Sequence, residues 1–326
     1  MQEKLLDVRD LCIQFETQSG TVKAVDHVSF DIKKGEVFAL VGESGCGKST
    51  TAMGIMQLIR SPGRISGGQV DFDGRDLLTL TGPEMTKVRG SEIGMIFQNP
   101  LDSLNPVYTV GTQMMEGLLV EKMDKSEAYK IAFDMLRDVK ISDVESRMKS
   151  YPHEISGGMR QRVMIGMMLC RNPKLLIADE PTTALDVTIQ AGIIELMNEL
   201  RRKFESAILI ITHDFGIVAD IADRVGVMYA GNLIEVGEVF EIFDHPRHPY
   251  TRLLMKALPT ITKEEGRLQT IKGFVPNLTE ERPGCSFADR CPNCQAECRE
   301  RKPVLREAAP GHMCACLLEE GGAVDA

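Results

Sequence analysis

The sequence predicts an α/β fold around a mixed sheet, and three patterns carry this prediction. The N-terminal stretches "LLDVRDLCIQF" and "AVDHVSFDI" alternate apolar and polar residues, as antiparallel strands with one solvated face do. "VFALV" is wholly apolar, which is typical of a strand covered on both faces, and a glycine-rich loop and a helical pattern follow it. "KLLIADE" and "SAILIITHD" are further apolar strands on either side of a long helical pattern, so they predict a parallel βαβ unit.

The middle of the chain is more helical than its two flanks. From about residue 95 to residue 171 apolar residues recur at intervals of three and four, as in "KSEAYKIAFDMLRDV", which predicts a helical insertion. The composition changes again at "DHPRHPY", where a stretch with several prolines begins. We therefore expect a first domain over residues 1–245 and a smaller C-terminal extension over residues 246–326.

Charge and composition exclude some classes of function. The formal net charge is −9 and no block of Lys and Arg occurs, so the chain lacks the basic surface that binds a nucleic-acid backbone. The sequence has no apolar run long enough to span a membrane, and "MQEKLLDVRD" lacks the order of a signal peptide. We expect a cytosolic chain with no nucleic-acid partner, which can still dock on a membrane protein.

The glycine-rich loop is the strongest local signal of function. Residues 42–49, "GESGCGKS", fit the P-loop pattern G-x-x-x-x-G-K-[ST]. In this pattern backbone N–H groups turn toward the phosphates of a nucleotide, the lysine adds a positive charge, and the last hydroxyl can bind Mg²⁺. The N-terminus of the following helix reinforces the anion site. We expect these phosphate-binding residues: Gly42, Ser44, Gly45, Gly47, Lys48, Ser49 and Thr50.

A nucleotide site also needs groups that hold the metal ion and the attacking water. The apolar strand in "LLIADE" delivers Asp179 to its carboxyl end, where a carboxylate can support Mg²⁺ beside Ser49. Glu180 follows directly and can orient and polarise a water molecule. Two acidic residues at a strand end are common on protein surfaces, and it is the P-loop that makes these two candidates for a catalytic site.

One further motif resembles that of a known family. "ISGGMRQRV", residues 155–163, is similar to the signature motif of the ATP-binding cassette (ABC) ATPases and lies between the P-loop and "LLIADE", as it does in that family. The resemblance covers about residues 4 to 245 and extends to other family motifs. They are the adenine-stacking aromatic at Phe15, the Q-loop at Gln98, the D-loop at Leu185 and Asp186, and the switch histidine at His213.

The resemblance implies a set of roles for these residues. Ser156, Gly157 and Gly158 open a helix whose N-terminus would meet the γ-phosphate bound by an opposite subunit, so ATP would join two cassettes and hydrolysis would release them. His213 would contact the γ-phosphate, and Gln98 would sense metal and water. The sequence departs from the family at Ile155, Met159 and Phe15, where the family more often has Leu, Gln and Tyr. None of these removes a phosphate ligand, so hydrolysis is still expected.

Two segments outside the motor resemble one group within this family. "FQNPLDSLNPVYTVGTQMME", together with "HPRHPYTRLLMKALP" and the cysteine-containing tail, is similar to the ATPases of dipeptide, oligopeptide and nickel importers. This implies a subunit bound peripherally at the cytoplasmic face of the membrane, with two separate permease subunits and indirectly a substrate-binding protein. It also implies a heterodimer with a second ABC ATPase. The residues leave the cargo open among dipeptides, oligopeptides, nickel and other small molecules.

A different class of function competes with import. A soluble ABC ATPase without a permease, for example one that handles iron–sulfur clusters, would share the motor. The segment after Gln98 and the "HPYT" sequence favour the importer. A DNA-repair cassette is a weaker alternative, because it needs long insertions and a basic face that this chain lacks.

The tail concentrates six of the nine cysteines between residues 285 and 316, and in a reducing compartment this favours metal over disulfides. Cys285, Cys291, Cys298 and Cys316 occupy positions that resemble the iron–sulfur ligands of the peptide-importer ATPases. Four thiolates suit either a [4Fe–4S] cluster or tetrahedral zinc. The four lack the paired C-x₂-C spacing of zinc ribbons, although Cys291 and Cys294 form one such pair. The sequence also leaves open the alternative that the tail binds no metal.

Overall fold

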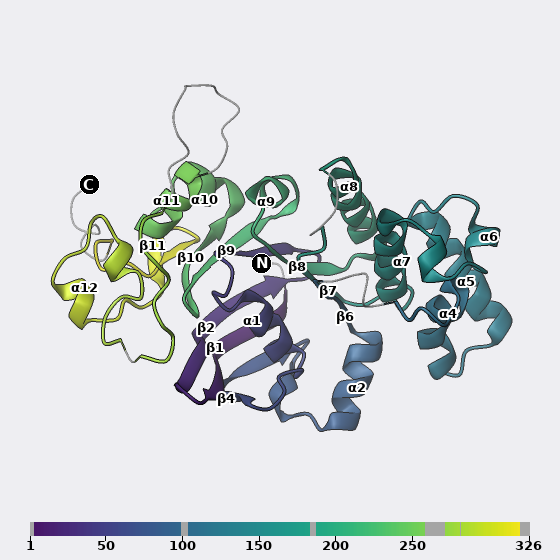
Figure 1. Ribbon diagram of the computed structural model, residues 1–326, viewed down its shortest axis with the longest axis horizontal. Helices are drawn as coiled ribbons and strands as arrows, with labels where there is room; N and C mark the ends of the chain where they lie inside the picture. The colour runs from purple at the N-terminus through teal and green to yellow at the C-terminus, as the bar shows by residue number, and fades with distance from the viewer. Residues whose placement is uncertain (1–2, 99–103, 183–186, 258–270, 281, 320–326) are drawn as a thin grey trace. The chain divides into compact units, whose positions relative to one another are not determined.

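The computed structural model divides the chain into two compact units (Figure 1). Unit 1 consists of Met1–Glu3, Lys33–Val37 and Thr79–Ile211, and unit 2 of Lys4–Ile32, Phe38–Leu78 and Thr212–Ala326. Within them the structure describes residues 3–98, 104–182, 187–257, 271–280 and 282–319. The P-loop belongs to unit 2, and the carboxylates that follow "LLIA" belong to unit 1.

An antiparallel sheet in unit 2 contains β1 (Lys4–Thr17), β2 (Gly20–Lys33), β4 (Gly63–Phe72) and β5 (Arg75–Asp76), in the order β2-β1-β4-β5. β1 and β4 pair from Leu6 opposite Phe72 to Phe15 opposite Gly63. Leu6 and Val8 of β1 are buried, whereas Arg9 and Asp10 are exposed. One apolar face therefore packs inward, which confirms the antiparallel strands predicted from the alternating pattern.

The second sheet of unit 2 has the order β11-β12-β10-β9-β3. It consists of β3 (Val37–Val41), β9 (Arg224–Tyr229), β10 (Asn232–Glu238), β11 (Arg306–Ala309) and β12 (His312–Cys314). β3 runs parallel to β9, and the other neighbouring pairs are antiparallel. The sheet is therefore mixed, as expected. Every residue of β3 is buried, as its apolar sequence predicts for a central strand.

The helices of unit 2 include α1 (Lys48–Ile55), which begins at the P-loop lysine, and α9 (Phe215–Ile221), which follows His213. Gly54 of α1 lies so close to Ile13 of β1 that a Cβ atom would be 2.5 Å from the Ile13 Cδ1. This contact fixes α1 against the antiparallel sheet. Further along the chain are α10 (Val239–Asp244), α11 (Pro249–Ala257) and α12 (Glu297–Glu300).

Unit 1 contains the predicted βαβ unit. Three parallel strands are neighbours in the order β8-β7-β6: β6 (Ile93–Ile96), β7 (Leu175–Asp179) and β8 (Ala207–Thr212). The helix α8 (Val187–Phe204) connects β7 to β8. Parallel strands align their carboxyl ends at one edge of a sheet. The residues that follow β6 and β7 are therefore neighbours at that edge.

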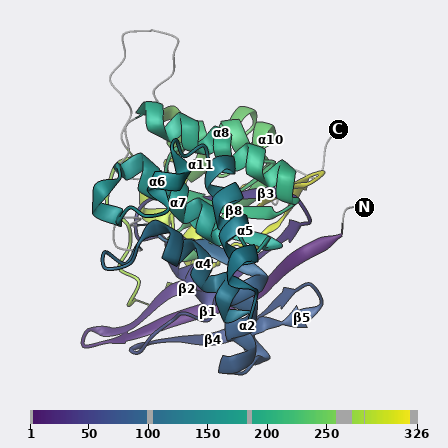
Figure 2. The ribbon, with the colours of Figure 1, turned by 90° about the vertical axis from the view of Figure 1, so that its right-hand side faces the viewer.

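The remaining helices of unit 1 are α2 (Gly82–Ser91), α4 (Val110–Val120), α5 (Lys125–Asp138), α6 (Val144–Arg147) and α7 (Gly157–Leu169). α4, α5 and α7 pack on one another (Figure 2). Asp124 caps α5 by accepting hydrogen bonds from the N–H groups of Ser126 and Glu127. Ala128 and Ala132, one turn apart on α5, are buried, as the helical spacing predicts.

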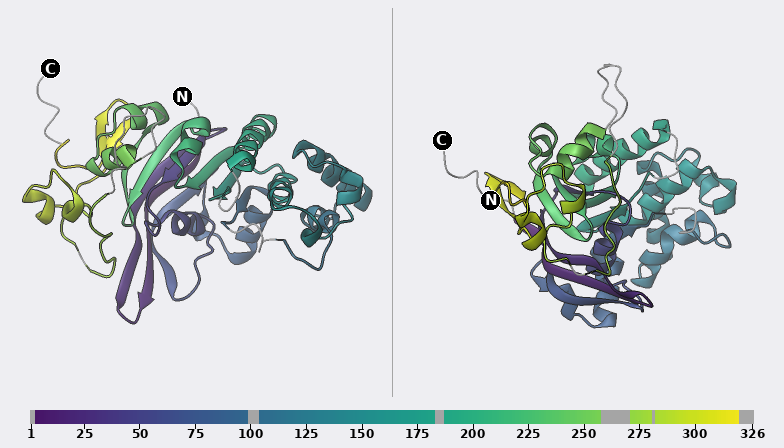
Figure 3. Two further views of the ribbon diagram at one scale, coloured as in Figure 1. Left: turned by 45° about the horizontal axis from the view of Figure 1, so that its top comes forward. Right: turned by 60° about the vertical axis from the view of Figure 1, so that its left-hand side comes forward.

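The C-terminal extension joins the sheet of unit 2. β12 pairs with β10, with Glu235 opposite Cys314 and Val236 opposite Met313, and β11 lies beyond β12 at the edge (yellow in Figure 3). The His312 side chain and the Glu235 carboxylate, both buried, form a 2.7 Å hydrogen bond between these strands. Residues before and after position 245 thus belong to one sheet. The domain boundary that the sequence predicts at this position remains a prediction. Among the described residues, no helix is both long and apolar enough to cross a membrane.

Candidate nucleotide-binding site

The backbone of the P-loop requires glycine at two positions in particular. Gly42 has a φ of +147°, and a Cβ atom there would overlap the carbonyl oxygen of Met228 and lie 2.9 Å from the Cys46 Sγ. Gly47 has a φ of +106°, and a Cβ atom there would overlap the carbonyl oxygen of Ala24. Only glycine combines this backbone conformation with such close packing. The loop is therefore fixed in shape by its neighbours β9 and β2.

Lys48 is buried at the start of α1, and its ammonium group is held by the loop itself. The Nζ donates hydrogen bonds of 2.8 Å to the carbonyl of Gly42 and 3.1 Å to the carbonyl of Glu43. Ser49 and Thr50 follow as half-buried residues, and Ser44 and Gly45 are exposed at the tip of the loop. The loop therefore combines a fixed positive charge with backbone and hydroxyl groups that reach solvent, as an anion-binding loop requires.

Cys46 occupies a variable position of the loop and is buried. Burial raises the pKa of its thiol, although Lys48 acts in the opposite direction. The group stays protonated at neutral pH, and it is a packing residue rather than a nucleophile.

Phe15 and His213 are the other predicted nucleotide contacts in unit 2. Phe15 lies on β1 opposite Gly63, and a Cβ at Gly63 would be 2.5 Å from the Phe15 ring, so this glycine makes room for the aromatic side chain. His213 is exposed directly after β8. The next residue, Asp214, caps α9 by accepting a 2.8 Å hydrogen bond from the Gly216 N–H, which fixes the backbone beside the histidine.

In unit 1 the structure brings Gln98 and Glu180 together. Gln98 follows β6 and Glu180 follows β7, and the Gln98 Nε2 donates a 2.9 Å hydrogen bond to the Glu180 Oε2. Glu180 has a φ of +46°, and its N–H donates a 2.8 Å hydrogen bond to the carbonyl of Ile211. A left-handed backbone at a non-glycine residue is uncommon and is often found at functional sites. Asp179, the last residue of β7, is buried.

The signature segment forms a capped helix N-terminus. Ser156 precedes α7, and its hydroxyl accepts a 3.3 Å hydrogen bond from the Met159 N–H. Gly157 has open space around it, while Gly158 is buried, and a Cβ there would be 3.0 Å from the Ile189 Cγ2. The exposed Ser156 and the free space beside Gly157 leave room for a ligand at this helix end.

The predicted residues thus fall into two groups. Unit 2 holds Phe15, the P-loop and His213, and unit 1 holds Gln98, Asp179, Glu180 and the signature segment. Leu185 and Asp186 of the predicted D-loop lie outside the described residues. Sequence reasoning missed Glu43 of the P-loop and its two partners, Tyr250 and Arg290. The only signal for them was the position of Glu43 within the P-loop pattern and of Tyr250 within "HPYT".

The cysteines of the tail lie on one small folded segment. The Cys285 N–H donates a 2.7 Å hydrogen bond to the carbonyl of Cys298, and Cys298 and Cys316 are buried. The pKa of the Cys285 thiol is raised to about 11, mainly by burial, and the nearby Cys316, Cys291 and Cys298 contribute to this rise. The four cysteines that the sequence singled out thus interact electrostatically, but so do Cys294 with Cys291 and Cys314 with Cys316, and the choice of four stays a prediction.

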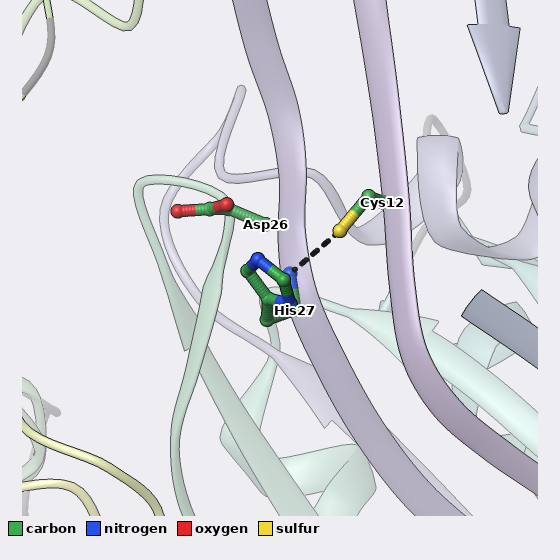
Figure 4. A group of neighbouring side chains, drawn as sticks. All are labelled: Cys12, Asp26 and His27. Carbon is green, nitrogen blue, oxygen red and sulfur yellow. Dashed lines mark hydrogen bonds between the residues drawn. The ribbon is translucent and has the colours of Figure 1, made fainter. Parts of the chain in front are cut away.

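Another group of possible metal ligands lies on the antiparallel sheet. The ligand atoms of Cys12, Asp26 and His27 lie within 4.8 Å of one another, and this is the only such group of three or more within the described ranges (Figure 4). The Cys12 Sγ accepts a 3.4 Å hydrogen bond from the His27 N–H, and Asp26 pairs with Lys302. Because Asp26 already has a cationic partner and His27 is exposed, we assign no metal to this group.

The fold and these residues define a class of protein. A phosphate-binding loop after β3 and an acidic pair after β7 are the two halves of a P-loop nucleotide hydrolase. Comparison with known proteins narrows the class. The chain matches the family model described as ABC transporter over residues 25–183, and the model described as "Oligopeptide/dipeptide transporter, C-terminal region" over residues 234–298.

Relatives of known type match nearly the whole chain. A probable peptide ABC transporter ATP-binding protein of Sinorhizobium fredii is 50% identical over 96% of this chain and 94% of its own length. The oligopeptide transport ATP-binding protein OppD of Salmonella typhimurium is 49% identical, over 96% of this chain and 93% of its own. The dipeptide transport ATP-binding protein DppD of Bacillus subtilis is 48% identical, over 98% and 96%.

Solved structures agree with the fold. The ATP-binding cassette MJ0796, in a dimeric post-hydrolysis state with ADP and Pi, matches with a TM-score of 0.65 and 26% identity over 72% of this chain and 98% of its own. The cassette cbiO1 of Clostridium perfringens matches with a TM-score of 0.66 and 30% identity, over 75% and 92%. The chain belongs to the family of ATP-binding subunits of peptide ABC transporters. The predicted ABC fold and ATPase activity are confirmed, and the soluble non-transport alternative is not favoured.

Proposed function

We propose that this chain binds and hydrolyses ATP to energise the import of peptides through separate membrane permeases. The observation that carries the proposal is the match of residues 234–298 to the oligopeptide and dipeptide transporter C-terminal region. In addition, about half of the residues are identical to those of peptide-transporter ATP-binding proteins over nearly the whole chain. ATP and Mg²⁺ are the ligands expected of such an ATPase. The division into residues 1–245 and 246–326 is part of this proposal.

The roles of the site residues follow from their chemistry. The N–H groups of the P-loop and the charge of Lys48 bind the phosphates, and Phe15 stacks on adenine. Ser49, Gln98 and Asp179 are the residues that would hold Mg²⁺, because they carry the oxygen ligands it prefers, and a bound ion would supply positive charge to the phosphates. The buried position of Asp179 and the hydroxyl of Ser49 support this assignment.

Glu180 is the base that polarises the attacking water. The hydrogen bonds from its N–H to Ile211 and from Gln98 to its carboxylate support this role, because both restrict the position of the carboxylate. His213 contacts the γ-phosphate. Ser156, Gly157 and Gly158 bind the γ-phosphate held by an opposite cassette.

The productive complex contains a second, different ABC ATPase at the cytoplasmic face of the membrane. Two permease subunits bind this pair, and a substrate-binding protein delivers the cargo to them. The near full-length likeness to OppD and DppD proteins supports this assembly.

A complex purified after co-expression tests the assembly. We expect ATP hydrolysis by this chain, a second ATPase and two permeases to accelerate at least about fivefold when a peptide-loaded binding protein is added. The isolated chain should give no acceleration. An isolated chain that forms an ATP-dependent homodimer and drives the permeases at the full rate would contradict the heterodimer.

The tail is proposed to hold a [4Fe–4S] cluster through Cys285, Cys291, Cys298 and Cys316. Around a single zinc ion four thiolates would be about 3.8 Å apart, given a Zn–S bond of about 2.3 Å. Across the described ranges no three cysteines of the tail come within 4.8 Å of one another, so the arrangement does not suit zinc. The thiolates of a cubane cluster bind four different irons and lie farther apart than those around one zinc ion. Such a cluster is structural, because phosphoryl transfer needs no redox step.

Single cysteine substitutions test the cluster. Anaerobically purified protein should be brown and hold about four irons per chain. Cys285→Ser or Cys316→Ser should remove the colour, whereas Cys294→Ser, the matched control on the same segment, should keep it. A colourless anaerobic protein with stoichiometric zinc, or loss of colour on changing Cys294 alone, would contradict the assignment.

A further inference from the structure

Glu43 places a carboxylate within the phosphate-binding loop. It occupies a variable position directly after Gly42, and its side chain is half-buried. A negative charge beside a triphosphate site repels the ligand, and the repulsion is stronger where protein excludes water. A P-loop with an unpaired glutamate here would therefore bind ATP poorly.

Arg290 of the C-terminal extension neutralises this carboxylate in a two-bond geometry. Its Nη1 lies 2.8 Å from the Glu43 Oε2, and its Nη2 lies 3.0 Å from the Glu43 Oε1. Paired hydrogen bonds between a guanidinium and a carboxylate are the strong, oriented kind. The hydrogen bond to Glu43 is the main reason that the pKa of Arg290 is raised.

The other N–H groups of Arg290 are also satisfied. The Nη1 donates to the Tyr229 hydroxyl at 3.3 Å, the Nη2 to the carbonyl of Ile271 at 3.4 Å, and the Nε to the carbonyl of Lys272 at 3.1 Å. With the two bonds to Glu43, all five donors of the guanidinium have acceptors. The side chain is only 5% exposed. Three of these hydrogen bonds hold Arg290 independently of Glu43.

A second residue beyond the P-loop holds the backbone of Glu43. The Glu43 N–H donates a 3.1 Å hydrogen bond to the hydroxyl of Tyr250, which is fully buried. The ring of Tyr250 packs against Tyr229 and Phe287 with centroids 4.7 Å and 5.3 Å away. The carbonyl of the same Glu43 accepts the hydrogen bond from Lys48. One residue of the loop therefore connects Lys48 to the C-terminal part of unit 2.

Both Phe287 and Arg290 lie on the short segment between Cys285 and Cys291. This segment contains a single turn of 3-10 helix, Ala288–Arg290. The backbone hydrogen bond from the Cys285 N–H to the Cys298 carbonyl holds the start of the segment. The same segment thus joins Cys285 and Cys291 and carries Arg290, which reaches Glu43, and Phe287, which packs against Tyr250.

We propose that Arg290 is a positioning residue for ATP binding: it cancels the charge of Glu43 and fixes the part of the loop that holds Lys48. The extension thereby sets the affinity of the P-loop for nucleotide. The proposal rests on ATP binding by the loop and is independent of any metal on the cysteines.

The test measures the Kd of the full-length chain for a fluorescent ATP analogue. Arg290→Ala leaves the Glu43 carboxylate unpaired and should raise the Kd about tenfold. Adding Glu43→Gln to that variant removes the charge and should bring the Kd back to within about threefold of the wild type. In steady-state hydrolysis the KM for ATP should rise with little change in kcat.

Two further variants keep the test decisive. Arg299→Ala, next to Cys298 but exposed and paired with Asp289, is the matched control and should leave the Kd unchanged. Arg290→Gln keeps a donor for the surrounding carbonyls and replaces the alanine variant if that variant does not fold. Glu43→Gln should restore the Kd of this variant as well. An unchanged Kd in the Arg290 variants, or a Kd that Glu43→Gln fails to restore, overturns the proposal.

Discussion

Glu180→Gln should lower the rate of ATP hydrolysis more than about a hundredfold and leave ATP affinity within about threefold of the wild type. Glutamine keeps the size of the side chain and can still bond to Gln98, whose amide also offers an oxygen acceptor. It cannot accept a proton from the attacking water. The loss therefore falls on the chemical step, and the variant should accumulate in an ATP-bound, closed assembly.

Single-turnover hydrolysis and equilibrium binding on the same preparation separate these effects. Glu195→Gln, an exposed residue on α8 of the same unit, is the matched control and should hydrolyse ATP at the wild-type rate. Turnover close to that of the wild type in the Glu180→Gln complex would show that another group acts as the base.

Lys48→Ala should weaken ATP binding itself, by roughly 30- to 100-fold, which is the range expected for the loss of a charged hydrogen bond to phosphate. The substitution removes the one buried ammonium group of the described P-loop and leaves the carbonyls of Gly42 and Glu43 without that donor. Binding of a fluorescent ATP analogue measures the effect directly.

The control for Lys48 is an exposed lysine that is not one of the predicted nucleotide-binding residues. Lys87→Ala, exposed on α2, should bind ATP as the wild type does. Retained affinity in Lys48→Ala would mean that the backbone N–H groups alone hold the phosphates.

Local patterns predicted the elements that carry the chemistry. The alternation in β1, the apolar run of β3 and the spacing of apolar residues in α5 each reflect how a single element meets the core. The proximity of Gln98 and Glu180 was not predicted, because no pattern had indicated that β6 is a strand parallel to β7, and this pairing is what places the two residues at one edge of the sheet.

Long-range pairings could not be predicted from such patterns. β12 is only three residues long and has no alternation to detect, so its addition to β10 was not foreseen. Arg290 and Glu43 are separated by 247 residues, and no local rule links an arginine in a cysteine-rich tail to a variable position of the P-loop. These contacts depend on how the whole of unit 2 packs.

ATP-driven release of peptide from inverted membrane vesicles tests the central claim most directly. The vesicles should hold this chain with its permeases and second ATPase, so that the ATPases face the outer buffer and the binding protein with labelled peptide is enclosed. We expect ATP added outside to drive release of the peptide from the vesicles, and Lys48→Ala or Glu180→Gln to abolish that release while Lys87→Ala preserves it. Release that is independent of ATP, or unaffected by both substitutions, would contradict the account.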